Sequence, residues 1–159
     1  MTDLLTSLAA SPFSTWLRES PSVWAYPTIL TLHTLGLGVL VGANWMVDLR
    51  VLGAGSAIPL GVLSRAFPIM WTGFWLNAIS GVLLLVSDPS KGTTTLFMWK
   101  LGTIAIGVAL ILLLKRKVYG RGVEMDRASL GVKTMAALSL VIWIAAIATG
   151  RWMAYATGT

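Results

Sequence analysis

The sequence predicts an all-α integral membrane protein, an antiparallel four-helix bundle with a short N-terminal interfacial segment. Of its 159 residues, 56% are hydrophobic and 11% are charged, whereas soluble domains are about 25% charged. Four apolar stretches also approach the roughly 20 residues that a helix needs to cross a bilayer. So little charge would not cover the surface of a soluble fold. We therefore expect one membrane domain over residues 1–159.

The chain opens with MTDLLTSLAASPFSTWLRES, which lacks the basic start and unbroken apolar core of a cleavable signal peptide. We expect this segment to lie in the membrane interface. Phe13 and Trp16 would enter the lipid there, while Arg18 and Glu19 would remain in water.

Four spans follow in order. The first covers residues 24–47, with Pro27 in its opening turns, where a helix tolerates proline. The second covers residues 67–86 and ends at the turn-forming stretch SDPSKG. The third and fourth cover residues 95–114 and 134–153, on either side of a basic loop.

The orientation follows from the distribution of basic residues. The loops after the first and third spans hold most of them: Arg50, Arg65, Lys115, Arg116, Lys117, Arg121, Arg127 and Lys133. Because cytoplasmic loops are enriched in Lys and Arg, we expect both termini outside the cytoplasm of a bacterial inner membrane. This reading also accounts for the net charge of +6 without a nucleic-acid partner.

Several kinds of chemistry are excluded or disfavoured. The chain has no cysteine, which excludes disulfides, thiolate metal sites and cysteine nucleophiles. Asp48 and Asp88 fall at the ends of spans rather than inside them, so we do not expect a carboxylate-driven pump. Phosphate-loop, zinc-protease and nucleophile-elbow motifs are also missing. We do not expect the chain to be an enzyme by itself.

One group of residues favours a cofactor. His33 is the only histidine and lies well inside the first span, and Lys100 and Arg151 lie near the outer ends of the third and fourth spans. Neutral imidazole is a good axial ligand for haem iron, and haem propionates pair with cations. We therefore expect haem b on His33, with Lys100 and Arg151 holding propionates. Arg50 would anchor the cytoplasmic end of the first helix.

Other readings remain open. A single buried histidine also satisfies itself by hydrogen bonding, with Asn77 or Thr103 as partners here. The chain would then be a cofactor-free structural or partner-binding subunit, and an oligomer is compatible with it. Copper is a third reading, since His and Met bind copper(I). No methionine is expected at the level of His33.

Small residues predict which faces of the spans pack together. The first span has Gly38 and Gly42 four residues apart, and Gly36 one turn after His33. The second aligns Gly73 with Asn77 and Gly81, the third aligns Thr103 with Gly107, and the fourth aligns Ser139 with Trp143 and Gly150. We expect Gly36 and Gly38 to make room for a flat ring, lined by Trp24, Trp75 and Trp99.

Three segments resemble a known family. The stretch LHTLGLGVLVGANWMVDLRVLG, residues 32–53, resembles the first-helix signature of bacterial four-helix membrane proteins of unknown function. The segments WTGFWLNAISGVLLLVSDP and LFMWKLGTIAIG look like the second and third helices of the same proteins. The resemblance covers residues 26–114, and the fourth helix is generic.

More distantly, the layout is similar to copper-resistance D-type membrane domains and to the four-helix bacterial protoporphyrinogen oxidase family. That oxidase family is associated with haem, and His33, Arg50 and Lys100 occupy places that match its histidine, arginine and lysine. Its longer basic motif and second histidine are missing here. The resemblance therefore implies haem binding, with a membrane or periplasmic redox partner, but not the oxidase activity.

Overall fold

The computed structural model describes residues 7–120 and 128–156. Over these ranges the chain forms helices joined by short connections, and it contains no strand. The elements are α2 (Pro12–Glu19), α3 (Tyr26–Leu52), α4 (Leu60–Leu63), α5 (Ala66–Ser87), η1 (Pro89–Thr93), α6 (Thr95–Tyr119) and α7 (Leu130–Ala156). The predicted all-α class is confirmed.

Four helical stretches are long and apolar enough to cross a membrane. They are α3, the run 61–87 that contains α5, α6, and α7 as far as Met153, with mean hydropathies between 1.4 and 2.1 in their most apolar windows. Each coincides with one predicted span. Their length and composition are those of a multi-pass membrane protein.

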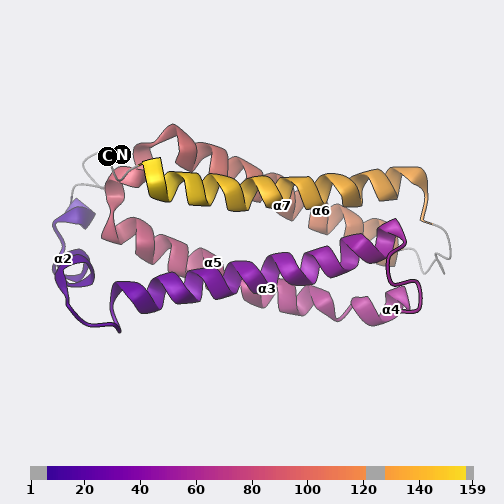
Figure 1. Cartoon of the computed structure of the whole chain (residues 1–159), viewed down its shortest axis with the longest axis horizontal. Coiled ribbons are helices and arrows are strands. Elements are labelled where there is room, and N and C mark those ends of the chain that lie inside the picture. The colour runs from indigo at the N-terminus through magenta and orange to yellow at the C-terminus, as the bar shows by residue number, and fades with distance from the viewer. Residues whose placement is uncertain (1–6, 121–127, 157–159) are drawn as a thin grey trace.

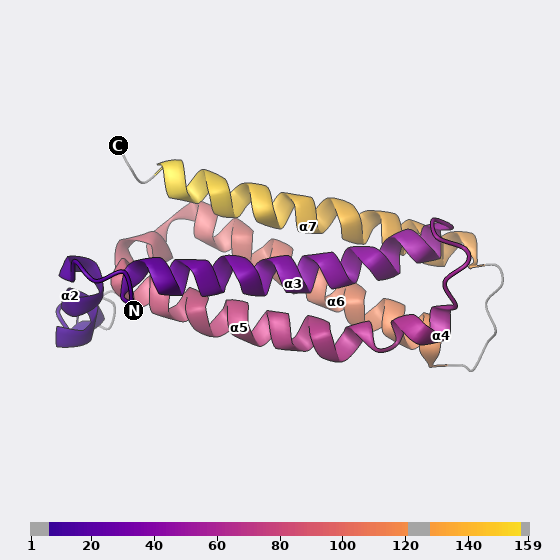
Figure 2. The same cartoon turned by 60° about the horizontal axis from the view of Figure 1, so that its bottom comes forward.

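α3, α5, α6 and α7 lie lengthwise beside one another and alternate in direction (Figure 1). α2 and the C-terminal end of α7 lie at one end of the bundle, called here the termini end (Figure 2). α4 lies at the opposite end, called the loop end. α3 packs mainly against α5, α6 packs mainly against α7, and contacts between α3 and α7 join the two helical hairpins. The predicted antiparallel bundle is confirmed.

The helices reach beyond the predicted spans at the loop end. α3 continues to Leu52 and α6 continues to Tyr119, with Arg50 and Lys117 in their last turns. Basic side chains stabilise a helix C-terminus because its free carbonyls carry partial negative charge. α3 then stops at Gly53, whose φ of 109° is a left-handed conformation that favours glycine.

The hydrophobic core lies mainly in the loop-end half. Its buried residues are Leu40, Val41, Ala43, Val47, Val51, Leu63, Ala66, Phe67, Met70, Ile111, Leu114, Val118, Val132, Ala136, Trp143 and Ala146. Few residues of this core come from the termini-end half, so the apolar core is thinner there. Exposed apolar side chains such as Leu30, Leu35 and Leu49 occur along all of α3, as lipid-facing residues would.

Glycines set the closest approach between α3 and α5. A Cβ atom on Gly36 would lie 2.6 Å from the backbone nitrogen of Asn77, and one on Gly73 would lie 2.7 Å from the backbone nitrogen of Leu40. Gly38 and Gly42 have nothing near the position of a Cβ. The expectation that Gly38 and Gly42 mark a packed face is wrong for this bundle, because helix rotation turns Gly36 inward instead.

The N-terminal segment contains the short helix α2. In α2 the rings of Phe13 and Trp16 stack with centroids 6.2 Å apart, and both side chains are exposed. On the opposite face, Ser14 is buried and its hydroxyl donates to the Val86 carbonyl at 2.7 Å. Arg18 donates to the Ser87 carbonyl at 3.4 Å. These bonds hold α2 against the end of α5.

Candidate functional site

His33 and Asn77 form reciprocal contacts between α3 and α5. Nδ1 of His33 lies 2.9 Å from the backbone oxygen of Asn77. The side-chain amide of Asn77 in turn donates to the backbone oxygen of His33 at 2.8 Å. Ser80 Oγ is 3.2 Å from the same ring nitrogen. Each helix therefore presents a side chain to a main-chain carbonyl of the other.

This geometry favours one form of the imidazole. Nδ1 of His33 lies 2.9 Å from the Asn77 carbonyl, which only accepts hydrogen bonds, and 3.3 Å from the Asn77 amide nitrogen. The shorter contact favours a proton on Nδ1. In the neutral ring, Nε2 then keeps its lone pair. An Nδ1–H bond to a carbonyl is the usual outer contact of a metal-binding histidine, because it orients the ring and makes Nε2 more basic.

A cavity of about 140 Å³ adjoins His33 at the termini end. Its lining combines basic groups with apolar walls: Tyr26, Leu30, His33, Gly81, Leu84, Leu85, Lys91, Phe97, Lys100, Gly150 and Met153. At Gly81 a Cβ atom would lie 3.1 Å from Cε1 of His33, so the imidazole would have to shift slightly. At Gly150 a Cβ atom would lie 3.8 Å from Nζ of Lys100. The two glycines thus leave space beside the histidine and the lysine.

The cavity has an excess of positive charge. Lys91 pairs with Asp88, their Nζ and Oδ2 atoms 3.3 Å apart, and this is the sole ion pair among residues 7–120 and 128–156. Lys100 therefore has no carboxylate partner within that part of the chain. A cation without a counter-charge beside apolar walls suits an anionic group on an otherwise apolar ligand.

The structure brings only some of the predicted site residues together. His33 and Lys100 line the same cavity, joined by Lys91 and Met153, which the sequence did not point to. Arg151 is exposed and does not line it, although its neighbour Gly150 does.

The predicted aromatic lining and the predicted absence of methionine are both wrong. Trp24, Trp75 and Trp99 are exposed on the outside of the bundle. Met153, expected at the outer edge, shares the cavity with His33 because α3 and α7 both run past this level. Gly36 and Gly38 do not make room for a ring inside the bundle. Gly36 contacts α5 closely, and Gly38 faces outward.

Arg50 lies at the loop end, far along α3 from the cavity. Its Nε donates to the Ile58 carbonyl at 2.6 Å, and a terminal nitrogen donates to the Ser56 carbonyl at 3.2 Å. These bonds hold the connection that follows α3. Arg50 therefore contacts the connection after α3 and does not line the cavity.

The side chains that line the cavity suit haem, but the volume of the cavity is too small to enclose it. Pockets that enclose a drug-sized molecule measure about 300–1,000 Å³, and this cavity measures about 140 Å³. It would enclose an edge of a haem ring and leave the rest against lipid or between displaced helices. Thr103, the other hydrogen-bond partner considered for His33, instead donates to the carbonyl of Lys100.

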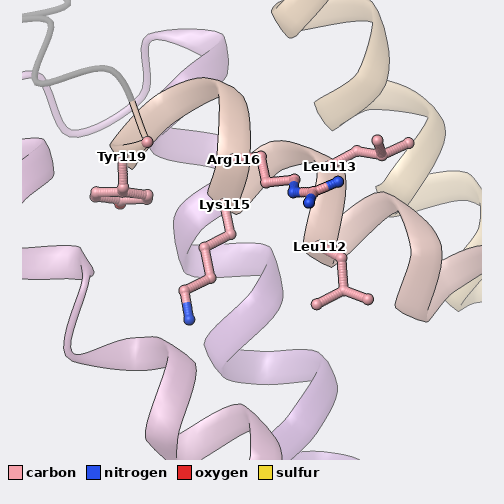
Figure 3. Close-up of a pocket in the computed structure, with 6 residues that line it drawn as sticks. Leu112, Leu113, Lys115, Arg116 and Tyr119 are labelled. Carbon is pink, nitrogen blue, oxygen red and sulfur yellow. The ribbon is translucent and has the colours of Figure 1, made fainter.

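A wider groove of about 600 Å³ opens at the loop end of α6. Leu112, Leu113, Lys115, Arg116 and Tyr119 line it (Figure 3). The side chains of Lys115 and Arg116 extend in different directions there (Figure 3). Lys115 Nζ lies 5.3 Å from the ring centre of Phe67. The basic groups therefore do not converge on one ligand position.

The sequence reading also missed a buried acid. Asp48 was expected at the end of a span, but α3 continues to Leu52 and Asp48 is 0% exposed. Its carboxylate accepts a hydrogen bond from Asn44, one turn earlier on the same helix. The spacing of Asn44 and Asp48 was the available signal, since it places both polar side chains on one face.

Comparisons with protein-family models, with curated proteins and with solved structures found no match to this chain. The resemblance to four-helix membrane families stays a prediction.

Proposed function

We propose that this membrane protein binds haem b at the termini end of its bundle and serves as an electron-transfer or accessory subunit. His33 is the axial ligand in this proposal, and Lys100 and Lys91 face the propionates. The observation that carries the proposal is the bond from Nδ1 of His33 to the Asn77 carbonyl, which leaves the lone pair on Nε2. The Asn77 amide nitrogen lies 3.4 Å from Nε2 and would have to move aside for a ligand. Haem, when bound, would supply one-electron chemistry.

The cavity residues have separate tasks. Asn77 orients the imidazole and keeps its proton on Nδ1. Lys100 and Lys91 attract the haem propionates, and Lys91 is itself paired with Asp88. The apolar walls exclude water, which strengthens the attraction between a lysine and a propionate. Arg151, exposed at the rim, would meet a propionate that extends out of the cavity.

The test is the absorption spectrum of protein purified from haem-supplied cells. We expect a Soret band in the wild type and its loss in His33→Ala. Thr34→Ala is the matched control, because Thr34 is the next residue, is exposed and bonds only within its own helix at the Leu30 carbonyl. A colourless wild type, or a band of equal strength in His33→Ala, contradicts the proposal.

A cofactor-free subunit is the second candidate. It is favoured by the observation that His33 and Asn77 already satisfy one another across α3 and α5. In that case the wild type would be colourless and would co-purify from native membranes with one defined complex. His33→Ala would then weaken the bundle without changing any spectrum.

Copper handling is favoured by one observation, the placement of Met153 in the same cavity as His33. Thioether and imidazole together suit copper(I). Metal analysis after copper loading would then show binding that both His33→Ala and Met153→Leu abolish.

We further propose that the termini end faces away from the cytoplasm of a bacterial inner membrane. The support is the distribution of Lys and Arg, which favours the loop end as the cytoplasmic side. The cavity would then open toward a periplasmic partner.

A further inference from the structure

A second polar cluster lies in the loop-end half of the bundle, apart from the His33 cavity. Asp48 and Ser139 are 0% exposed and Asn44 is 2% exposed. The amide of Asn44 donates to Oδ2 of Asp48 at 2.6 Å and to Oγ of Ser139 at 2.9 Å. The cluster thus joins α3 to α7 inside the apolar core.

Asp48 is incompletely satisfied in this cluster. Its other carboxyl oxygen, Oδ1, is buried and has no hydrogen-bond partner within the described residues. Asn44 has no further proton to offer, because its amide nitrogen already serves Asp48 and Ser139. An ionised Asp48 would therefore hold a negative charge with one oxygen unsolvated.

No cation neutralises that charge in the part of the chain that the structure describes. Arg50, on the same helix, donates to carbonyls of the following connection. On the neighbouring elements the basic side chains at this end are exposed: Arg65, Lys115, Arg116, Lys117 and Lys133. The hydroxyl of Tyr119 is buried but makes no hydrogen bond. Within the described residues, Asp48 therefore has only the neutral side chains of Asn44 and Ser139 beside it.

An unpaired carboxylate is costly in an apolar medium, and such a group usually becomes neutral by taking up a proton. Ionisable residues within membrane spans mark sites of proton or ion binding when no structural partner explains them. Asp48 meets both conditions. It also lies one turn from the end of α3, so the loop end is the shorter route between this carboxyl group and water.

We propose that Asp48 is a proton-binding site inside the bundle. A proton from water at the loop end binds the carboxylate at Oδ1, giving a neutral carboxylic acid, and it returns to water when the site empties. Asn44 positions the carboxyl group through Oδ2, and Ser139 holds the Asn44 amide in place. Because residues 7–120 and 128–156 supply no donor for an ionised Oδ1, release of the proton weakens the contact between α3 and α7.

Infrared spectroscopy of the purified protein tests this directly, since protonated and ionised carboxyl groups absorb at different frequencies. We expect a protonated-carboxyl band at neutral pH in the wild type and its loss in Asp48→Asn. Asp88→Asn, which removes an exposed acid beside Lys91, should keep the band. A wild type without the band, or a band that persists in Asp48→Asn, overturns the proposal.

A second measurement does not depend on the variant folding. The wild-type band should decrease only as the pH is raised well above the usual range of an aspartic acid, and the melting temperature should fall over the same range. Asp48→Asn, which mimics the neutral acid in shape, should show a smaller fall. A band that is already lost in the ordinary acidic range of an aspartic acid would show a solvated carboxylate and overturn the proposal.

Discussion

Asn77 and His33 each bond the main chain of the other helix, at 2.8 Å and 2.9 Å. This pair of hydrogen bonds affects both the packing of the helices and the chemistry of the imidazole. It joins α3 to α5 in the half of the bundle where the apolar core is thin, and it selects the ring nitrogen that a ligand can reach. A change at Asn77 should affect both stability and ligand binding.

Replacement of Asn77 by leucine should destabilise the bundle by about 0.5–2 kcal/mol, since interhelical hydrogen bonds in membranes contribute about that much. It removes the amide that bonds the His33 carbonyl and leaves this carbonyl without that partner. Unfolding in mixed detergent measures the loss. Thr72→Ala is the control, because Thr72 is exposed on the same helix and donates within that helix to the Pro68 carbonyl. Equal losses in both variants would show that Asn77 has no special role.

Gly36→Ala should destabilise the protein by about 1–3 kcal/mol, the usual cost of overpacking. The added methyl group would lie 2.6 Å from the Asn77 nitrogen, so α3 and α5 would have to separate. Gly38→Ala is matched in chemistry and helix, and nothing lies within 4 Å of its Cβ position. It should be neutral or slightly stabilising. A large loss at Gly38 and none at Gly36 would mean that α3 is rotated differently.

Asp88 provides a pH dependence at the termini end. Burial raises the pKa of this carboxyl, but hydrogen bonds from Ser90 and Lys91 and the charge of Lys91 outweigh burial, so its pKa is lowered. A lowered pKa in the folded state means that its stabilising contribution is present above the usual range of an aspartic acid. That contribution disappears as the pH falls through the folded pKa.

Asp88→Asn should therefore be slightly less stable than the wild type at neutral pH and equally stable in strong acid. The difference should be about 0.2–1 kcal/mol, as for other exposed pairs. Thermal unfolding of both proteins across the acidic range measures it. A difference that grows on acidification would contradict this account of Asp88.

The topology is open to cysteine labelling because the chain has no cysteine of its own. Ser90→Cys, in η1 at the termini end, should react with an impermeant thiol reagent added outside intact cells. Ser56→Cys, exposed at the loop end, should react only after the membrane is opened. The reverse pattern would place the His33 cavity on the cytoplasmic side.

Hydropathy predicted the four long helices and their order, because a bilayer requires long apolar segments. It also placed His33 and Lys100 at the same end, which depends only on where each residue falls along its span. It did not predict that Gly36 rather than Gly38 faces α5. That choice depends on the rotation of a helix that is apolar on all sides.

The buried Asp48 was missed for a related reason. The apolar pattern of the first span predicts an end at Val47, whereas the helix continues to Leu52 and packs against α7. Ser139, its partner across the bundle, is far away in sequence. Met153 likewise joins the cavity through a contact between helices that no local pattern shows.

The central claim is that the imidazole of His33 carries its proton on Nδ1 and offers Nε2 to a ligand. Since the chain has one histidine, nitrogen NMR of protein labelled at histidine, purified with a tag that lacks histidine, reports this ring alone. The account predicts a neutral ring with a protonated Nδ1 and an unprotonated Nε2, of which Nε2 changes most when haem is added. A ring protonated on Nε2, or one unchanged by haem, would contradict it.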